Sequence, residues 1–430
     1  MSQYLGSNSL KYVIKLILKF SSILVFLIGS LFMIIPVSAQ TEWYDEWVGT
    51  NAKNYEQKIT SGFIVEEFVV GLSFPTTMSF VDDDLLVLQK NDGMIIHFDK
   101  NGNLIKNPIF DLNVTNQYET GALGIISSDS TVYVYFTESD KDGNEPIGNN
   151  IYKFRWTGNS LEEPHLVRTL PAFPESLIHN GGTMIIDKEN VVYAVIGDQH
   201  MVNGGTILQN LFGKPNDTGV ILSVEEENEY FAIGIRNSFG LAIDPVTGNM
   251  WQTENGPGSF DEVNLVFPQF NSGWSAHTGP MSESRIDILP LPDIFGIWKS
   301  QLQLFFSSII ASFYLNESYE YQDPKFSWKI PVSPTALAFS NSSFGNYGNW
   351  LFVGDCNNGN IYKFQLNSNR DQFVFTDENL KDLIQHETDN IEEIIFGQGF
   401  GCITDIKFKD GKMYVVSLTD GIIYKIHPTF

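Results

Sequence analysis

Two short β-like runs flank a polar turn in Thr183-Met184-Ile185-Ile186-Asp187-Lys188-Glu189-Asn190-Val191-Val192-Tyr193-Ala194-Val195. Short β-branched and aromatic runs bounded by Asp, Asn or Gly are typical of strands joined by tight turns. A turn rich in these residues followed by a β run recurs in five further segments, at 83–88, 130–135, 248–253, 348–353 and 411–416. Repetition at intervals of several tens of residues indicates a radial repeat.

A further strand pattern lies upstream of each unit and fits an inner strand near a central axis. These patterns occupy 77–80, 123–126, 183–186, 241–244, 335–339 and 404–408. Six units of about four strands predict an all-β protein, a six-bladed β-propeller over residues 62–428. Residues 63–69 are expected to close the last blade with the first. A double β-sandwich could use the same strands, but the sixfold repetition favours the propeller.

Residues 281–327 interrupt this rhythm. The part from 293 to 314 is less strand-like than the repeats and is expected to contain a short helix. We interpret the whole segment as an insertion on one rim of the propeller. A surface elaboration, a lid and an interface are the alternative roles for it.

The composition indicates an exported globular protein. Hydrophobic residues make up 43% of the 430 residues, which is enough for a sizeable core. The formal charge of −25 argues against nucleic acid as the main partner, because phosphate binding needs a basic surface. Residues 1–39 contain lysines, an apolar run and the small residues of Val37-Ser38-Ala39, so we expect a cleaved signal peptide or a retained membrane anchor. The rest should then be extracellular or at the cell surface.

The two cysteines of the chain, Cys356 and Cys402, both fall late in the sequence. In an exported protein an isolated pair can oxidise to one disulfide. Two free buried thiols are the alternative. Short Asn-x-Ser/Thr sequons, for example at Asn113 and Asn341, are compatible with export but often arise by chance.

Polar clusters stand between the β runs in a fixed order. His179 and Asp198 lie on either side of one predicted strand pair, so a β meander can return both to one end of a blade. A neutral His can remove a hydroxyl proton, and a nearby carboxylate fixes its tautomer. Arg236-Asn237 adds a permanent cation in the next unit. Each residue alone is an ordinary turn residue, whereas their order favours one shared site.

A turn that can bind a hard cation follows in Glu254-Asn255-Gly256-Pro257-Gly258. Pro lacks an N–H and Gly permits open backbone, so this turn can present carbonyl oxygens suited to Ca²⁺. Asp261-Glu262 adds carboxylates just downstream, and a solvated acidic surface is the alternative for them.

The order and local sequences of these clusters resemble the soluble quinoprotein sugar dehydrogenases, the glucose/sorbosone dehydrogenase family. The most specific stretches are His179-Asn180-Gly181-Gly182, Gly234-Ile235-Arg236-Asn237-Ser238-Phe239-Gly240-Leu241-Ala242, and Glu254-Asn255-Gly256-Pro257 through to Asn271-Ser272-Gly273-Trp274. The resemblance covers most of residues 62–427 apart from the insertion. It implies a propeller that binds pyrroloquinoline quinone and Ca²⁺ at its axial mouth. The implied reaction oxidises the C1 hydroxyl of an aldose or related alcohol, with an external electron acceptor.

The resemblance also implies a role for each matching residue. His179 would be the general base, Asp198 its partner, and Arg236 the cation that polarises the quinone. The implied cofactor-binding set is Arg236, Asn237, Glu119 and Thr404. Glu119 stands where family members usually carry Gln beside the substrate. The implied metal-binding set is Gly256 and Pro257, through their carbonyls, and Glu262 at a second, structural Ca²⁺ site.

Three motifs depart from the family pattern. The last blade usually carries Arg-x-Arg-Asp, where this chain has Cys402-Ile403-Thr404-Asp405. The preceding blade usually offers a Lys near a turn that here contains Asp355, and Thr183 replaces an Arg. The catalytic half of the pocket is therefore retained and the cofactor-clamping half is rebuilt. Cys356 and Cys402 lie in the two rebuilt motifs of adjacent blades, so a disulfide between them near the pocket is expected.

These observations leave three functions open. An exported dehydrogenase that uses the quinone and Ca²⁺ is the leading hypothesis. A propeller that binds carbohydrate or protein without catalysis is the second, because the clamping arginines are missing and fold alone does not determine function. A Ca²⁺-dependent hydrolase of the lactonase type is the third, although no second carboxylate pair around the axis favours it.

Overall fold

The computed structural model describes residues 56–199, 217–226, 230–274, 277–283 and 319–429. The expected signal or anchor segment, residues 1–39, lies outside the described residues, as does the 293–314 part of the expected insertion. The described part of the chain is all-β, with 48% of its residues in strands and 3% in helices, and its strands have the β-propeller arrangement that the sequence predicts. Within the described residues, no helix has the length and apolar character needed to span a membrane.

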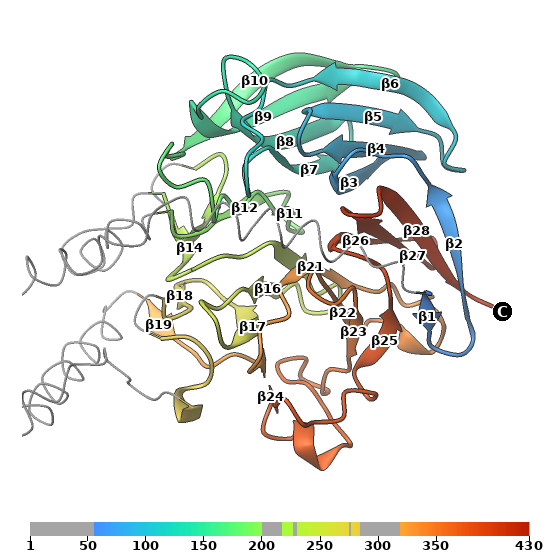
Figure 1. Ribbon diagram of the computed structural model, residues 1–430, viewed down its shortest axis with the longest axis vertical. Coiled ribbons are helices and arrows are strands. Elements are labelled where there is room, and N and C mark those ends of the chain that lie inside the picture. The colour runs from blue at the N-terminus through green and yellow to red at the C-terminus, as the bar shows by residue number, and fades with distance from the viewer. Residues whose placement is uncertain (1–55, 200–216, 227–229, 275–276, 284–318, 430) are drawn as a thin grey trace, which may run out of the picture. The chain divides into compact units, whose positions relative to one another are not determined.

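Six hydrogen-bonded sheets make up the fold (Figure 1). The first sheet contains β3 (Pro75–Val81), β4 (Asp84–Gln89), β5 (Met94–Phe98) and β6 (Leu104–Asp111). The second contains β7 (Ala122–Ser128), β8 (Thr131–Glu138), β9 (Gly148–Trp156) and β10 (Leu161–Leu170). The third contains β11 (Met184–Ile186), β12 (Val192–Ile196), β13 (Val220–Ser223), β14 (Tyr230–Ile233), β18 (Phe270–Asn271) and β19 (Glu320–Tyr321).

The remaining three sheets follow in chain order. The fourth contains β15 (Gly240–Ile243), β16 (Met250–Glu254), β17 (Asp261–Val266), β20 (Phe326–Trp328) and β24 (Ile384–Gln385). The fifth contains β21 (Pro334–Phe339), β22 (Leu351–Asp355), β23 (Ile361–Phe364), β25 (Ile395–Gln398) and β1 (Lys58–Ile59). The sixth contains β26 (Ile403–Lys409), β27 (Lys412–Ser417), β28 (Ile422–Pro428) and β2 (Phe63–Val69). Among the described residues, three short 3₁₀ helices lie between strands, η2 (Met281–Glu283), η4 (Gly345–Tyr347) and η5 (Glu378–Leu380).

The first strand of each sheet is the inner strand, and the inner strands contact one another in a closed cycle. The contacts run from β3 to β7, β11, β15, β21, β26 and back to β3. As the sequence predicts, β2 pairs antiparallel with β28. A geometric count of blades gives five where the sequence predicts six, although the sheets number six. The third sheet has the shortest inner strand, with three residues.

The turn chemistry explains why each repeat begins with a hairpin. The turn between the inner strand and the second strand contains a residue with positive φ in every sheet. These residues are Asp82, Asp129, Asn190, Gly248, Asn349 and Asp410. Asp, Asn and Gly adopt the left-handed region at the least steric cost, so the Asp/Asn/Gly pattern of the sequence encodes these turns directly.

Part of the expected insertion belongs to the sheets instead. β19 pairs with β18 in the third sheet, and β20 pairs with β17 in the fourth. Phe326 and Trp328 of β20 have no exposed surface, because they pack between the fourth and fifth sheets. The boundary of the insertion predicted at residue 327 was therefore wrong, since this aromatic segment is a buried outer strand.

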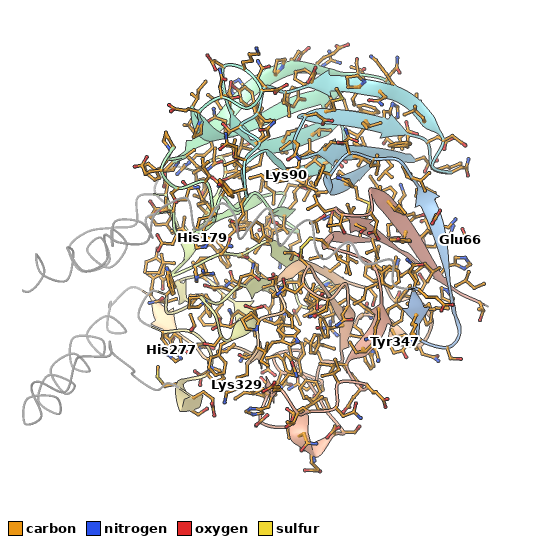
Figure 2. The ribbon with its side chains drawn as sticks, viewed as in Figure 1. Glu66, Lys90, His179, His277, Lys329 and Tyr347 are labelled. Atoms are coloured by element: carbon orange, nitrogen blue, oxygen red, sulfur yellow. A yellow bond between two sulfur atoms is a disulfide. The ribbon has the colours of Figure 1, made fainter. Side chains whose placement is uncertain are left out.

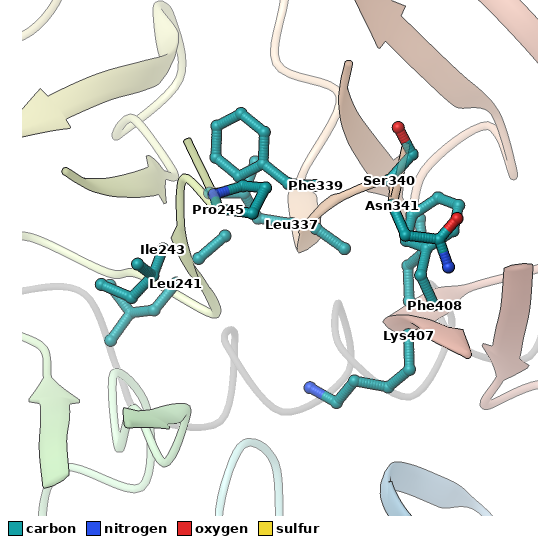
Figure 3. Close-up of a pocket in the computed structure, with 12 residues that line it drawn as sticks. Leu241, Ile243, Pro245, Leu337, Phe339, Ser340, Asn341, Lys407 and Phe408 are labelled. Atoms are coloured by element: carbon teal, nitrogen blue, oxygen red, sulfur yellow. The ribbon is translucent and has the colours of Figure 1, made fainter. Parts of the chain in front are cut away.

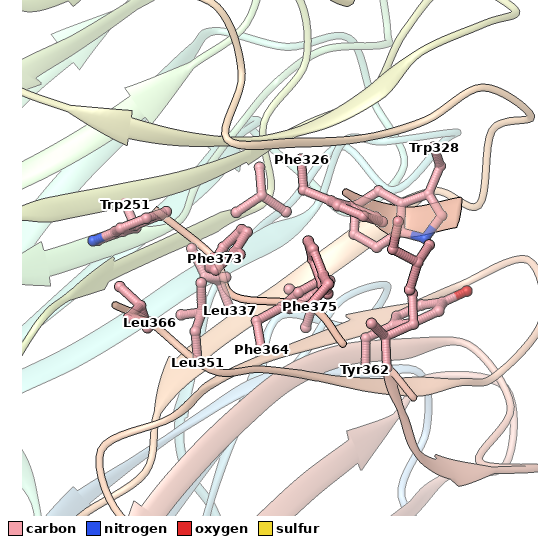
Figure 4. Packing of buried hydrophobic residues seen from close by; sticks show 14 of the residues in the cluster. Trp251, Phe326, Trp328, Leu337, Leu351, Tyr362, Phe364, Leu366, Phe373 and Phe375 are labelled. Atoms are coloured by element: carbon pink, nitrogen blue, oxygen red, sulfur yellow. The ribbon is translucent and has the colours of Figure 1, made fainter. Parts of the chain in front are cut away.

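The hydrophobic core lies between neighbouring sheets. In the cluster of Figure 4, Trp251 of β16 and both aromatic residues of β20 pack with Phe364 of β23 and with Phe373. The Phe364 and Phe373 rings stack with their centroids 4.6 Å apart. Burial of one such side chain contributes about 1.5–3 kcal/mol, so these aromatic layers hold adjacent sheets face to face.

A disulfide joins Cys356, which follows β22, to Cys402, which precedes β26. The expected pairing is therefore confirmed. Its two ends belong to the fifth and sixth sheets, and both cysteines are buried. The bond thus links two adjacent sheets at the edge where their inner strands begin.

Replacing both cysteines with serine is expected to lower the free energy of unfolding by about 2–4 kcal/mol. The bond spans 46 residues of chain, and a cross-link of that length restricts the unfolded state. Urea denaturation of the full chain measures the effect. Cys356→Ser alone should lower the free energy of unfolding about as much as the double variant does, because either change removes the same bond. Equal stability of the double variant and the parent would contradict this expectation.

Candidate active site

One edge of the propeller collects the polar residues that the sequence singles out. We call this edge the mouth: it is where each inner strand begins and where the second strand of each sheet ends. Glu119 precedes β7, His179 precedes β11 and Arg236 precedes β15. Asp198 follows β12 and Asn255 follows β16. Antiparallel pairing places these two groups of loops side by side, and the Gly197 N–H bonds to the His179 carbonyl at 3.1 Å.

His179 is buried and has one defined tautomer. Its Nδ1 lies 2.8 Å from the main-chain carbonyl oxygen of Asp198. A carbonyl only accepts hydrogen bonds, so Nδ1 carries the proton and Nε2 keeps its lone pair. Nε2 has no hydrogen-bond partner among the described residues. This is the form of imidazole that can accept a proton from a hydroxyl.

The partner of His179 differs in kind from the one predicted. The Asp198 carboxylate was expected to fix the tautomer, but it accepts a hydrogen bond from Trp274 Nε1 at 2.7 Å. The loop turns the Asp198 carbonyl toward His179 instead. A carbonyl orients the ring as a carboxylate would, but it supplies no full negative charge to stabilise imidazolium.

The electrostatic surroundings keep His179 neutral. Burial lowers its pKa from 6.5 to about 3, and the positive charge of Arg236 acts in the same direction. The hydrogen bond to the Asp198 carbonyl opposes both effects. The imidazole is therefore unprotonated throughout the physiological range.

Glu119 connects His179 to the other polar residues of the mouth. Its carboxylate accepts the main-chain N–H of His179, and Asn237 Nδ2 lies 3.4 Å from Oε1. Burial raises the pKa of the Glu119 carboxyl, while the His179 N–H and the charge of Arg236 act in the opposite direction. Glu119 also holds the His179 backbone, which has a φ of 62°.

Arg236 is held by the neighbouring loop. Its Nη1 donates to the Asn255 carbonyl at 2.6 Å, and its main-chain N–H donates to Glu254 Oε1 at 2.6 Å. The guanidinium carbon lies 5.4 Å from the centre of the Trp274 ring. The buried Nε of Arg236 has no partner. The mouth therefore contains a rigid cation with an unused donor.

Buried carboxylates lie behind the turn that is expected to bind Ca²⁺. Glu254 and Glu262 face each other across β16 and β17. Burial raises the pKa of both, and the like charge of Glu254 adds to the effect on Glu262. Asp261 Oδ1 accepts the Gly256 N–H at 2.8 Å, and Pro257 is exposed. Among the described residues, no three His, Cys, Asp or Glu side chains converge as a metal site.

The last two sheets contribute no cation at the positions compared with the family. The Thr404 hydroxyl donates to the Pro75 carbonyl at 3.2 Å, across the interface with the first sheet. The Thr183 hydroxyl donates to the Phe239 carbonyl at 2.6 Å. Asp355 is fully buried and accepts the Tyr362 hydroxyl at 2.8 Å, so its charge is held within its own turn. In the part of the chain that the structure describes, no hydrogen bond joins Thr404 to the group around His179.

Lys90 is a residue of the mouth that sequence reasoning missed (Figure 2 labels it with His179). It follows β4 as Asp198 follows β12, so an alignment of the repeats would have drawn attention to it. Its side chain is buried, which lowers its pKa to about 8, while the charge of Glu119 opposes the shift.

A separate pocket of about 280 Å³ lies near the opposite ends of the inner strands (Figure 3). It is lined by residues of β15, β21 and β26, including Leu241, Leu337 and Phe408. The lining is largely apolar and contains none of the residues of the mouth described above. It is therefore distinct from the polar site around His179.

A sequence profile of the Glucose / Sorbosone dehydrogenase family matches residues 72–288, which is half of the chain. The chain belongs to this family. Aldose sugar dehydrogenase YliI of Escherichia coli (strain K12) is 25% identical over 203 residues, 45% of this chain and 49% of that protein. Quinoprotein glucose dehydrogenase B of Acinetobacter calcoaceticus is 29% identical over 186 residues, 35% of this chain and 38% of that protein. The matches thus span half or less of the length of these relatives.

Solved structures show the same fold. The PQQ-bound aldose sugar dehydrogenase of Streptomyces coelicolor superposes with a TM-score of 0.58 at 18% identity, over 86% of this chain and 99% of that one. The apo-form of the soluble aldose sugar dehydrogenase of Escherichia coli gives a TM-score of 0.59 at 17% identity, over 85% and 99%. These structures support the propeller arrangement.

The residues of the mouth fit the family's quinone cofactor through unused polar atoms. Arg236 Nε is a buried donor without a partner, and Asn237 Oδ1, Ser238 Oγ and Asn255 Oδ1 are also unpaired in the described part of the chain. Buried polar groups normally have partners, so such a cluster indicates a polar ligand or ordered water. Arg236 and Asn237 would hold the quinone, whereas Thr404 has its hydroxyl bonded elsewhere.

We predict that His179 stays neutral between about pH 5 and pH 8. Its folded pKa of about 3 lies below the unfolded value of 6.5, so protonation favours the unfolded chain and this group's contribution to stability falls as pH drops below 6.5. Nitrogen-15 NMR of labelled histidine should show one protonated and one unprotonated ring nitrogen throughout, and His179→Gln identifies the resonance. A titration midpoint near 6.5 would exclude the proposed environment.

Proposed function

We propose that the chain is an exported oxidoreductase that oxidises the C1 hydroxyl of an aldose or related alcohol. His179 serves as general base, pyrroloquinoline quinone as cofactor, and Ca²⁺ as the bound metal. The observation that carries this proposal is the neutral His179, whose Nδ1 is fixed by the Asp198 carbonyl and whose Nε2 is unpaired. The named relatives are sugar dehydrogenases, which supports the substrate class.

His179 and Arg236 have separate roles in the proposed reaction. His179 Nε2 accepts the proton of the C1 hydroxyl and becomes imidazolium, with Nδ1–H still bonded to the Asp198 carbonyl. Arg236 places a positive charge beside the developing alkoxide and stabilises it. The quinone, when bound, supplies the acceptor for the hydride that leaves C1. The substrate loses two electrons and two hydrogens, so an aldose becomes a lactone.

The buried surroundings of His179 make it a weak base in the resting protein. A pKa of about 3 means that proton transfer alone is unfavourable at neutral pH. Proton removal must therefore be coupled to the departure of the hydride, which converts the alcohol into a stable product. Glu119, bonded to the His179 main chain, is the half-buried carboxylate whose negative charge would offset that of the imidazolium.

Ca²⁺ is proposed at two places. The carbonyls of Gly256 and Pro257 would hold the ion beside the cofactor, because this turn is partly open to the solvent. Glu262 would hold a second ion with nearby carbonyls, because it is buried opposite Glu254 and two buried carboxylates repel each other without a cation.

The proposal also includes a propeller of six blades and a location outside the cytoplasmic membrane. Each of the six sheets is taken as one blade, with the third sheet the least regular. The expected signal or anchor segment and the disulfide support export, since disulfides persist in oxidising compartments. The protein would then act outside the cytoplasmic membrane, secreted or held at the cell surface.

Titration with the quinone, with and without Ca²⁺, tests the cofactor. Calorimetry should show saturable binding that depends on Ca²⁺, and dye-linked oxidation of aldoses should appear only in the reconstituted protein. His179→Gln should lower kcat by roughly 10²- to 10⁴-fold, because it removes the base. Its quinone affinity should stay close to that of the parent. The absence of quinone binding to the parent would reject the proposal.

A propeller that binds carbohydrate without redox chemistry is the second candidate. It is favoured by one observation, the commitment of Thr183 and Thr404 to contacts between sheets where the family carries arginine. In that case Ca²⁺ and sugar would bind to the parent with no quinone binding at any Ca²⁺ concentration.

Ca²⁺ is expected to raise the melting temperature of the full chain, because a ligand that binds only the folded state stabilises it. Glu262→Gln should reduce this increase by removing one buried carboxylate from the structural site. Glu189→Gln is the control, since that side chain is exposed and lies outside the mouth. Differential scanning calorimetry in chelator and in Ca²⁺ measures both. An equal increase in Glu262→Gln and the parent would remove Glu262 from the metal site.

A further inference from the structure

We propose that Lys90 forms a carboxylate-binding subsite at the mouth, in place of the cations that the last two sheets lack. The carboxylate belongs either to the quinone cofactor or to an acidic sugar such as a uronate. This inference rests on the proposed function for the identity of the ligand. The position and contacts of Lys90 carry the rest of the argument.

Lys90 is held at the interface of the first and second sheets. Its main-chain N–H donates to the Phe74 carbonyl at 2.9 Å, and its carbonyl accepts the Ala122 N–H at 3.0 Å. Phe74 and Ala122 stand at the beginnings of the two inner strands. The backbone of Lys90 is thus fixed at the same edge as Glu119 and His179.

The chain leaves room for the Lys90 side chain by placing glycine beside it. Gly121 has a φ of +134°, and a Cβ at this position would lie 2.8 Å from Lys90 Cγ and 2.5 Å from the Lys90 carbonyl oxygen. Any other residue at position 121 would displace the lysine stem. Gly121 is two residues from Glu119, so the aliphatic part of the Lys90 side chain passes the loop that carries the Glu119 carboxylate.

The ammonium group of Lys90 has unused hydrogen-bonding capacity. Lys90 is only 8% exposed, and Nζ donates to Asn91 Oδ1 at 3.1 Å. An ammonium has three donors, so two are without a partner among the described residues. Within those residues, no carboxylate lies close enough to Lys90 to form an ion pair. A buried charge with two free donors is costly, and a ligand oxygen would satisfy it.

Of the two cations Lys90 and Arg236, Lys90 is the one whose positive charge is less balanced by nearby negative charge. Four carboxylates act on Arg236, whereas Glu119 alone acts on Lys90. Both oxygens of Glu119 already face the N–H of His179 and the amide of Asn237. An incoming carboxylate therefore gains the most favourable electrostatic interaction by binding near Lys90.

The class of ligand follows from the charge of this group. Neutral hydroxyls can use free N–H donors, but a charge-assisted bond to a carboxylate is about twice as strong. The positions where the family carries arginine, 183 and 404, have their hydroxyls bonded to main-chain carbonyls. Relocation of the cation to the first sheet would restore carboxylate binding without those arginines.

Calorimetric titration of the full chain, in Ca²⁺, tests the subsite with two probes. One arm uses pyrroloquinoline quinone, and the other compares D-glucuronate with D-glucose. Lys90→Met keeps the length of the stem and removes the charge, and it should weaken carboxylate binding by roughly 10- to 150-fold, the loss of one charge-assisted bond. Lys90→Arg should retain most of the affinity.

Two further variants make the test independent of that substitution. Lys100→Met removes an equal charge from the turn after β5 of the same sheet, where the side chain is exposed, and should change affinity less than about twofold. Glu119→Gln removes the negative charge nearest to Lys90 and should strengthen carboxylate binding. If Lys90→Met does not fold, an unchanged or weaker affinity in Glu119→Gln overturns the subsite.

The two arms separate this inference from the proposed function. A Lys90-dependent loss of quinone binding assigns the carboxylate to the cofactor, and a Lys90-dependent preference for glucuronate over glucose assigns it to the substrate. Glucuronate binding through Lys90 without quinone binding would support the subsite and reject the quinone. Quinone binding that Lys90→Met leaves intact, with no preference for glucuronate, would overturn the subsite alone. A parent that binds neither probe would overturn both.

Discussion

Closure of the ring is the constraint on which the site depends. β2 pairs with β28, so the sixth sheet combines strands from both ends of the described chain. Asp405 adds a second link, because its Oδ2 accepts the Thr77 hydroxyl at 2.8 Å and the Met78 N–H at 3.0 Å. These bonds join the last sheet to the first. Lys90, after the second strand of the first sheet, can therefore share one mouth with loops that are hundreds of residues away.

The contacts that close the ring include two of the positions at which the chain departs from the family pattern. Four interfaces between inner strands contain a threonine hydroxyl that donates to a carbonyl of the next sheet. The pairs are Thr76 with Ala122, Thr183 with Phe239, Thr335 with Ile403, and Thr404 with Pro75. At the other two, Gly124 and Gly240 allow close packing against Gly182 and Leu337. At positions 183 and 404, where the family pattern has arginine, this chain uses a neutral hydroxyl donor between neighbouring sheets.

The sequence allowed the strands to be predicted because local patterns determine them. Asp, Asn and Gly at the hairpins, and aromatic and β-branched runs between them, act within a few residues. The disulfide was also predictable, since the chain has only two cysteines and they lie in the corresponding motifs of adjacent blades. The orientation of Asp198 was not, because it depends on Trp274, a distant residue that binds its carboxylate. Lys90 was missed for the same reason: its role depends on Gly121 and Glu119 in another sheet.

The mouth contains two cations, Lys90 and Arg236, although the net charge of the chain is negative. A net charge of −25 repels a ligand with carboxylates at long range. At physiological ionic strength, however, exposed charges are screened beyond about 8 Å, whereas buried charges are screened much less. Lys90 is buried and Arg236 is half-buried beside Glu119, so both act on a bound ligand at short range and with less screening than exposed charges. The acidic surface then affects how fast an anion arrives, and the buried cations determine how tightly it is held.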